Sequence, residues 1–140
     1  MRRNIQQAIF LTILLVEFTG LFAQEALAQV TTSQIDFEAT NLVTVFQGLK
    51  NVRDNYLQIQ ISPNNYLVAL AQQTNSTLPK TVMLLQSSIN ECLAHMQNLE
   101  YVRAQGGPAG LYADSVIQRL AAQYRLSCPR SIAELLSRPY

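Results

Sequence analysis

Residues 79–108 read PKTVMLLQSSINECLAHMQNLEYVRAQGGP, and this stretch decides the fold. Its apolar residues are separated alternately by three and four positions, which is the spacing of one face of an α-helix. They are Val82, Leu85, Ile89, Cys92, Met96 and Leu99. Gly106-Gly107-Pro108 then ends the helix, because glycine adopts the left-handed conformation found at helix ends. The sequence therefore predicts a long helix over 79–104 followed by a tight reversal.

A second long helix is predicted over residues 33–58, before the stretch quoted above. Its apolar residues also share one face. They are Ile35, Leu42, Val45, Phe46, Leu49, Val52, Tyr56 and Ile59. Ser33, with Asp36 three residues later, resembles a capping box that has Asp in place of Glu. Residues 57–61 alternate with a period of two, as a β-strand would, but no second alternating run offers that strand a partner.

Three shorter helices complete the prediction. Ser62-Pro63 begins one, since serine caps helices and proline fits the first helical position. After the reversal, residues 109–126 form another, which should lie antiparallel to the helix before it. A short helix follows Pro129. The fold class expected is all-α, a small bundle of four to five helices with one disulfide, after a cleaved signal peptide.

The first 28 residues have the pattern of a signal peptide. Arg2 and Arg3 supply the positive start, and residues 8–16 (AIFLTILLV) form the apolar run. Ala26 and Ala28 match the small residues of an A-x-A cleavage site. We therefore expect a leader of the Sec type that directs the chain out of the cytosol.

A retained membrane helix is the alternative to cleavage. The apolar stretch 8–23 is shorter than the roughly 20 residues that a bilayer requires, and Glu17 lies inside it. Cleavage is therefore the prediction, which gives a signal peptide over 1–28 and a single helical domain over 29–140. The mature chain is expected to be periplasmic or secreted, with no stable membrane anchor.

Cys92 and Cys128 are the only cysteines of the chain. An even number of cysteines in an oxidising compartment favours a disulfide, and two cysteines allow one pairing. A zinc site needs about four ligands, and a redox pair has C-x-x-C spacing, which these two residues lack. We predict a structural disulfide between Cys92 and Cys128, and no metal or other cofactor.

The charge of the chain argues against nucleic-acid binding. Charged residues make up 14% of the 140 residues, below the average of about 25%, and the net charge is +1. Binding to phosphates requires clustered Lys and Arg side chains. The arginines near the C-terminus are interrupted by acidic residues, so we interpret them as part of a solvated surface.

No pattern in the sequence predicts catalysis. His95, the only histidine, follows Glu91 by one helical turn, and such a pair can tune a general base. No nucleophile accompanies the pair, so we expect His95 at the surface or at the rim of the core. Asp36 and Glu38 are two positions apart on a helix and should point to different sides. A carboxylate pair that forms only in the folded protein remains an alternative.

The function expected is that of a binding or structural module, such as an inhibitor, an immunity-type protein or an envelope-assembly component. Its partner is expected to be another protein. The six tyrosines, among many Gln and Asn residues, suit a partly polar binding surface, although half-burial in a bundle explains them as well. One alternative is a carrier of a small apolar molecule, in which Met83 and Met96 adapt to the ligand. Others are a membrane-anchored protein with an uncleaved N-terminal helix, or an enzyme with dispersed catalytic residues.

Overall fold

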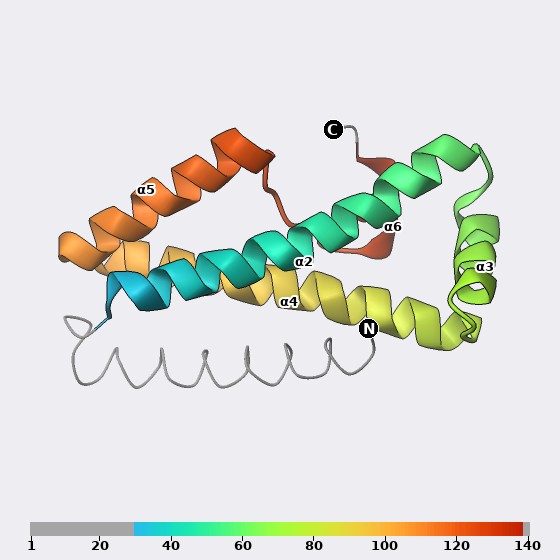
Figure 1. Ribbon diagram of the computed structural model, residues 1–140, viewed down its shortest axis with the longest axis horizontal. Helices are drawn as coiled ribbons and strands as arrows, with labels where there is room; N and C mark the ends of the chain where they lie inside the picture. The colour runs from blue at the N-terminus through green and yellow to red at the C-terminus, as the bar shows by residue number, and fades with distance from the viewer. Residues whose placement is uncertain (1–29, 139–140) are drawn as a thin grey trace.

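The computed structural model describes residues 30–138, and all regular secondary structure in this range is helical (Figure 1). The elements are α2 (Thr32–Ile59), α3 (Pro63–Gln73), α4 (Leu78–Gln105), α5 (Gly107–Tyr124) and α6 (Ile132–Ser137). The all-α bundle predicted from the sequence is therefore confirmed. The predicted leader over 1–28 lies outside the described residues.

Polar side chains at the first residues of the helices explain where the helices begin. Thr31 Oγ1 accepts a bond from the Gln34 backbone N–H at 3.2 Å, and Gln34 Oε1 accepts one from the Thr31 N–H at 2.9 Å. This capping box starts α2 two residues before the Ser33 expected, because glutamine completes the box as glutamate would. Ser62 caps α3 as predicted, and Thr77 caps α4.

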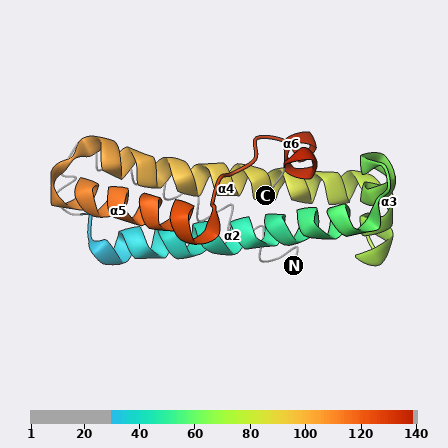
Figure 2. The same ribbon diagram turned by 90° about the horizontal axis from the view of Figure 1, so that it is seen from above.

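The helices form an elongated bundle in which α2 and α4 lie side by side along its whole length (Figures 1 and 2). The shorter α5 packs along the first half of α2 and the last half of α4. The small α6 packs on the same two helices beyond the end of α5, and α3 crosses the far end of the bundle. Because α5 is short, a continuous third helix covers only part of the α2–α4 pair.

Gly106 joins α4 and α5 directly, since it is both the C-cap residue of α4 and the N-cap residue of α5. Gly106 has φ +73° and Gly107 has φ +69°, a region of backbone conformation that favours glycine. The tight reversal predicted from Gly-Gly-Pro is confirmed. It places α5 antiparallel to α4 (Figure 1).

The core follows the predicted apolar face of α4 closely and that of α2 only in part. The fully buried side chains of the core include Leu42, Phe46, Ile89, Cys92, Leu99, Val116 and Leu135. On α2, however, Arg53 occupies a core position with no exposed surface, whereas Ile59 is 48% exposed. The predicted apolar face of α2 was therefore wrong near the C-terminal end of the helix. A charged side chain can occupy a core position when hydrogen-bond and ion-pair partners surround it there.

Candidate functional site

A cluster of four polar residues is buried between α2 and α4. Glu38, Glu91, His95 and Asn98 are each less than one-tenth exposed. His95 Nδ1 lies 2.6 Å from Glu38 Oε1, and Asn98 Nδ2 donates to the same oxygen at 2.8 Å. On the other side of the ring, His95 Nε2 lies 3.7 Å from Glu91 Oε1, an ion-pair distance. The imidazole therefore lies between two carboxylates.

The two carboxylates set the protonation state of His95. Burial alone lowers the pKa of the imidazole, but the hydrogen bonds and charges of Glu38 and Glu91 outweigh burial and raise it to about 9. The ring is therefore a cation at neutral pH, and it lies within reach of two carboxylates. Because His95 is 1% exposed, it holds α2 against α4 rather than meeting a substrate.

The surface position expected for His95 was wrong. Glu91 and His95 are one turn apart on α4, as the sequence indicated, but the residue that binds the ring most closely is Glu38 of α2. Glu38 and Asp36 do point to different sides, as predicted. Asp36 Oδ1 accepts a 2.6 Å hydrogen bond from the Tyr112 hydroxyl of α5.

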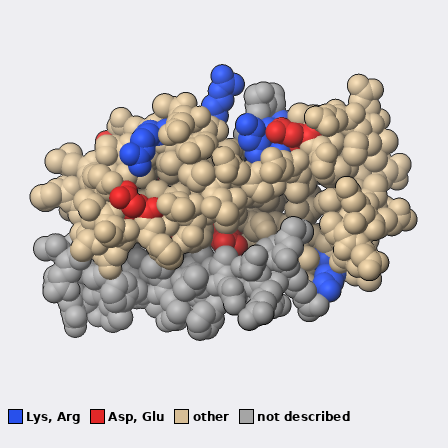
Figure 3. All heavy atoms as spheres, in the orientation of Figure 1, with Lys and Arg blue, Asp and Glu red and all other residues tan. Residues whose placement is uncertain are grey.

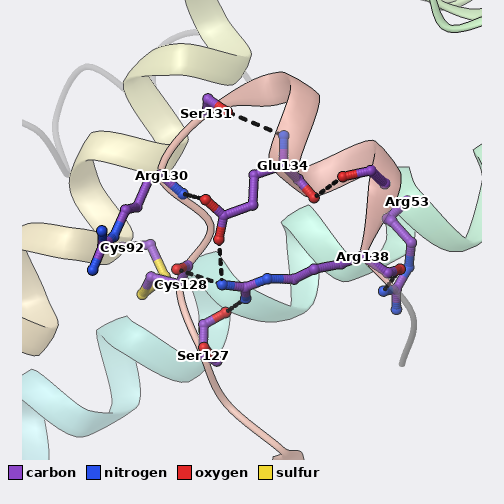
Figure 4. Close-up of polar contacts among 9 residues, drawn as sticks. Arg53, Cys92, Ser127, Cys128, Arg130, Ser131, Glu134 and Arg138 are labelled. Atoms are coloured by element: carbon purple, nitrogen blue, oxygen red, sulfur yellow. Dashed lines mark hydrogen bonds and ion pairs between the residues drawn. A yellow bond between two sulfur atoms is a disulfide. The ribbon is translucent and has the colours of Figure 1, made fainter.

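The disulfide joins the α5–α6 linker to α4. Cys92 and Cys128 are bonded through their sulfurs, with their Cα atoms 5.8 Å apart, so the predicted pairing is confirmed. Figure 4 shows the guanidinium of Arg138 beside this bond. Arg138 donates to the carbonyl oxygens of Ser127 and Cys128, and its Nη2 lies 2.5 Å from Glu134 Oε1.

Arg53 connects the C-terminal segment to α2. Its Nη1 donates to the Arg138 carbonyl oxygen at 3.1 Å, and its Nε and Nη2 both donate to Asp54 Oδ1. A buried guanidinium is costly unless such partners surround it. The covalent bond and this polar network together join α6 and its linker to α2 and α4.

A cleft of about 490 Å³ opens between α2 and α5. Its base is formed by Ala39, Val43 and Leu120, of which Ala39 and Leu120 are buried. Its walls carry polar side chains of both helices, namely Asp36, Thr40, Thr44, Tyr112, Arg119, Gln123 and Tyr124. The cleft is therefore apolar at its base and polar at its rim.

A second cleft, of about 450 Å³, continues along α2 past the end of α5. Gln123 and Tyr124 line both clefts, so the two form one groove. The second part is lined by Phe46, Gln47, Lys50, Arg53, Asp54, Leu57, Ala122, Gln123, Tyr124 and Arg125. We call the two clefts together the α2–α5 groove. Figure 3 shows this face to be largely uncharged, with scattered Lys and Arg side chains and a few Asp and Glu side chains near them.

The sequence did not predict this groove. Tyr112 and Tyr124 line it, and both are among the six tyrosines that we associated with a partly polar binding surface. Tyr66, another of the six, is buried instead and donates a hydrogen bond to the Val52 carbonyl oxygen. The second part of the groove opens where α5 ends and α2 continues. A signal for it was present in the unequal lengths of the predicted helices.

The described residues offer no cluster of three or more His, Cys, Asp or Glu side chains placed to hold a metal ion. Within 30–138, none of the helices has the length and apolar character needed to cross a bilayer. The chain matches no family model, no curated protein and no solved structure.

Proposed function

We infer that this chain is an exported protein-binding module and that the α2–α5 groove is its binding site. The observation that carries the proposal is the continuity of two clefts, of about 490 and 450 Å³, along one side of the bundle. Binding sites combine an apolar centre with a polar rim, as this groove does. Tyr112 and Tyr124 add aromatic rings with polar hydroxyls, which are enriched at interfaces.

Export is supported by two features of the chain. The leader pattern over 1–28 predicts removal after Ala28, and the Cys92–Cys128 bond suits an oxidising compartment. N-terminal sequencing of the protein from its native host should give Gln29 as the first residue. An intact Met1 would overturn the export part of the proposal and favour a retained N-terminal helix.

The proposal does not include catalysis. The one histidine is enclosed between Glu38 and Glu91, where it cannot contact a substrate while the bundle is folded. A carrier of an apolar molecule is also less well supported. Met83, which we expected to adapt to such a ligand, is 59% exposed on α4.

A photo-crosslinking amino acid placed in the groove tests the binding function. Gln123 is the position of choice, because it is exposed and lines both clefts. Gln97 of α4 is the matched control, since it is also exposed but does not line the groove. In the native host, we expect one protein adduct from position 123 and none from position 97. No adduct, or equal adducts from both, would overturn the proposal.

A further inference from the structure

The charge of the α2–α5 groove indicates the kind of partner that it accepts, and this inference rests on the protein-binding function proposed above. Lys50 lies on the α2 wall, Arg119 on the α5 wall, and Arg125 where α5 ends. Within residues 30–138, none of these three side chains forms a hydrogen bond or an ion pair. Three cations therefore face the space that a partner would occupy.

The acidic residues of the groove do not fully neutralise its cations, because the two carboxylates in the lining face four cations, Lys50, Arg53, Arg119 and Arg125. Asp54 is bonded to Arg53, and Asp36 accepts a hydrogen bond from Tyr112. Among residues 30–138, the lining contains no other carboxylate. The charge that the groove presents to a ligand is therefore positive, although the whole chain carries only +1.

The shape of the groove favours a helical occupant. Its lining runs along α2 from Asp36 to Leu57, which is roughly 30 Å at 1.5 Å per residue. A peptide that binds as a β-strand adds to the edge of a sheet, and the described part of this chain contains only helices. A helix satisfies its own backbone hydrogen bonds and can place apolar side chains on the accessible apolar lining, which is Val43, Leu57 and Ala122.

We propose that the α2–α5 groove binds an acidic amphipathic helix of a partner protein. The apolar face of that helix packs on the base of the groove, and carboxylates on its flanks pair with Lys50, Arg119 and Arg125. The helix lies beside α5 and continues past its end, over the part of α2 that α5 leaves uncovered. A membrane surface fits less well, because the cations line a recess between helices, which a flat bilayer cannot enter.

Three synthetic helical peptides test this proposal on the disulfide-bonded protein. They share one apolar face and carry Glu, Gln or Lys on the flanks. We expect the Glu peptide to bind at least about tenfold more tightly than the Gln peptide, with the difference reduced in high salt. Its NMR chemical-shift changes should lie along α2 and α5. Equal binding of the three peptides, or no binding, would overturn the proposal.

A pair of charge-reversal variants provides the matched control. Lys50→Glu/Arg119→Glu should lower the affinity for the Glu peptide by at least about tenfold. Lys80→Glu/Arg130→Glu makes the same charge change outside the groove and should change that affinity by less than about twofold. Arg125 is left in place because its backbone, with φ +52°, ends α5. Equal losses in the two variants would indicate a nonspecific charge effect and overturn the proposal.

Two further outcomes separate this inference from the function on which it rests. If the protein binds vesicles of anionic lipid but not the Glu peptide, the ligand of the groove is a membrane surface. That result would overturn the inference. If the partner crosslinked at Gln123 is captured equally well when the protein also carries Lys50→Glu/Arg119→Glu, the outcome would support the binding function and overturn the inference that the partner's helix is acidic. Absence of any crosslinked partner at Gln123 would remove the binding function itself.

Discussion

The imidazole of His95 in α4 and the carboxylate of Glu38 in α2 form a buried pair, with 2.6 Å between Nδ1 and Oε1. The two residues are 57 positions apart in the sequence, so the contact exists only when α2 packs on α4. Glu91 lies on the far side of the ring. Removing the cation from this cluster should leave two carboxylates in the core with no positive partner.

Replacing His95 should therefore destabilise the bundle. Breaking a buried ion pair by removing one partner costs about 3–5 kcal/mol, and we expect His95→Ala to lower the free energy of unfolding by about that amount. Urea denaturation followed by circular dichroism measures it. Gln97→Ala, two residues along α4 and exposed, is the control and should change stability by less than about 0.5 kcal/mol. A loss below about 1 kcal/mol for His95→Ala would contradict a charged cluster.

Stability should fall as the pH rises from about 6.5 to 9. Below pH 6.5 the folded and the unfolded chain both hold the proton of His95, so its contribution is fully present. Above that pH the unfolded chain releases the proton first, because the folded pKa is about 9. The contribution lost over this window is about 3 kcal/mol. Glu38→Gln should flatten the slope, and an unchanged slope in that variant would exclude His95 as its source.

Removal of the disulfide should weaken the whole fold. A bond that closes a loop of 36 residues stabilises a protein by about 4 kcal/mol if the chain-entropy model holds. Cys92→Ser/Cys128→Ser should lower the free energy of unfolding by about this amount, measured by urea denaturation. The wild-type protein in a reducing agent should match the double variant. A wild-type protein unaffected by full reduction would show that the bond adds no stability.

Arg138 should hold the α5–α6 linker in place independently of the disulfide. Arg138→Ala removes the donors to the Ser127 and Cys128 carbonyl oxygens and the ion pair with Glu134, at a cost of about 1–3 kcal/mol. Hydrogen exchange should become faster in α6 while that of α4 changes little. Arg130→Ala removes a neighbouring exposed arginine and should leave exchange in α6 unchanged. Equal effects of the two variants would contradict a specific role for Arg138.

Two helical glycines should respond in opposite directions to alanine. A Cβ atom at Gly48 would meet no atom within 4 Å, so Gly48→Ala should raise stability by about 0.5–1 kcal/mol through helix propensity. At Gly110 the added atom would lie 3.1 Å from the Arg103 carbonyl oxygen, where α5 approaches the end of α4. Gly110→Ala should therefore lower stability. Thermal unfolding measures both changes, and a stabilised Gly110→Ala variant would show that the contact relaxes freely.

Local features of the sequence determined most of the helix boundaries and the pairing of the cysteines. Ser62 and Gly106 act through the backbone of their own neighbourhood, so their effects can be predicted without the rest of the fold. Cys92 and Cys128 could pair only with each other. The apolar face of α4 was also predictable, because burial of apolar side chains follows the helical period.

Only the tertiary structure decided which polar residues are buried and where the surface is hollow. His95 and Arg53 are in the core because Glu38 and the Arg138 carbonyl oxygen, from distant parts of the chain, accept hydrogen bonds from them there. A hydropathy pattern assigns such residues to the surface, since it does not contain their partners. The α2–α5 groove likewise depends on where α5 ends against α2, a relation between helices that no single segment encodes.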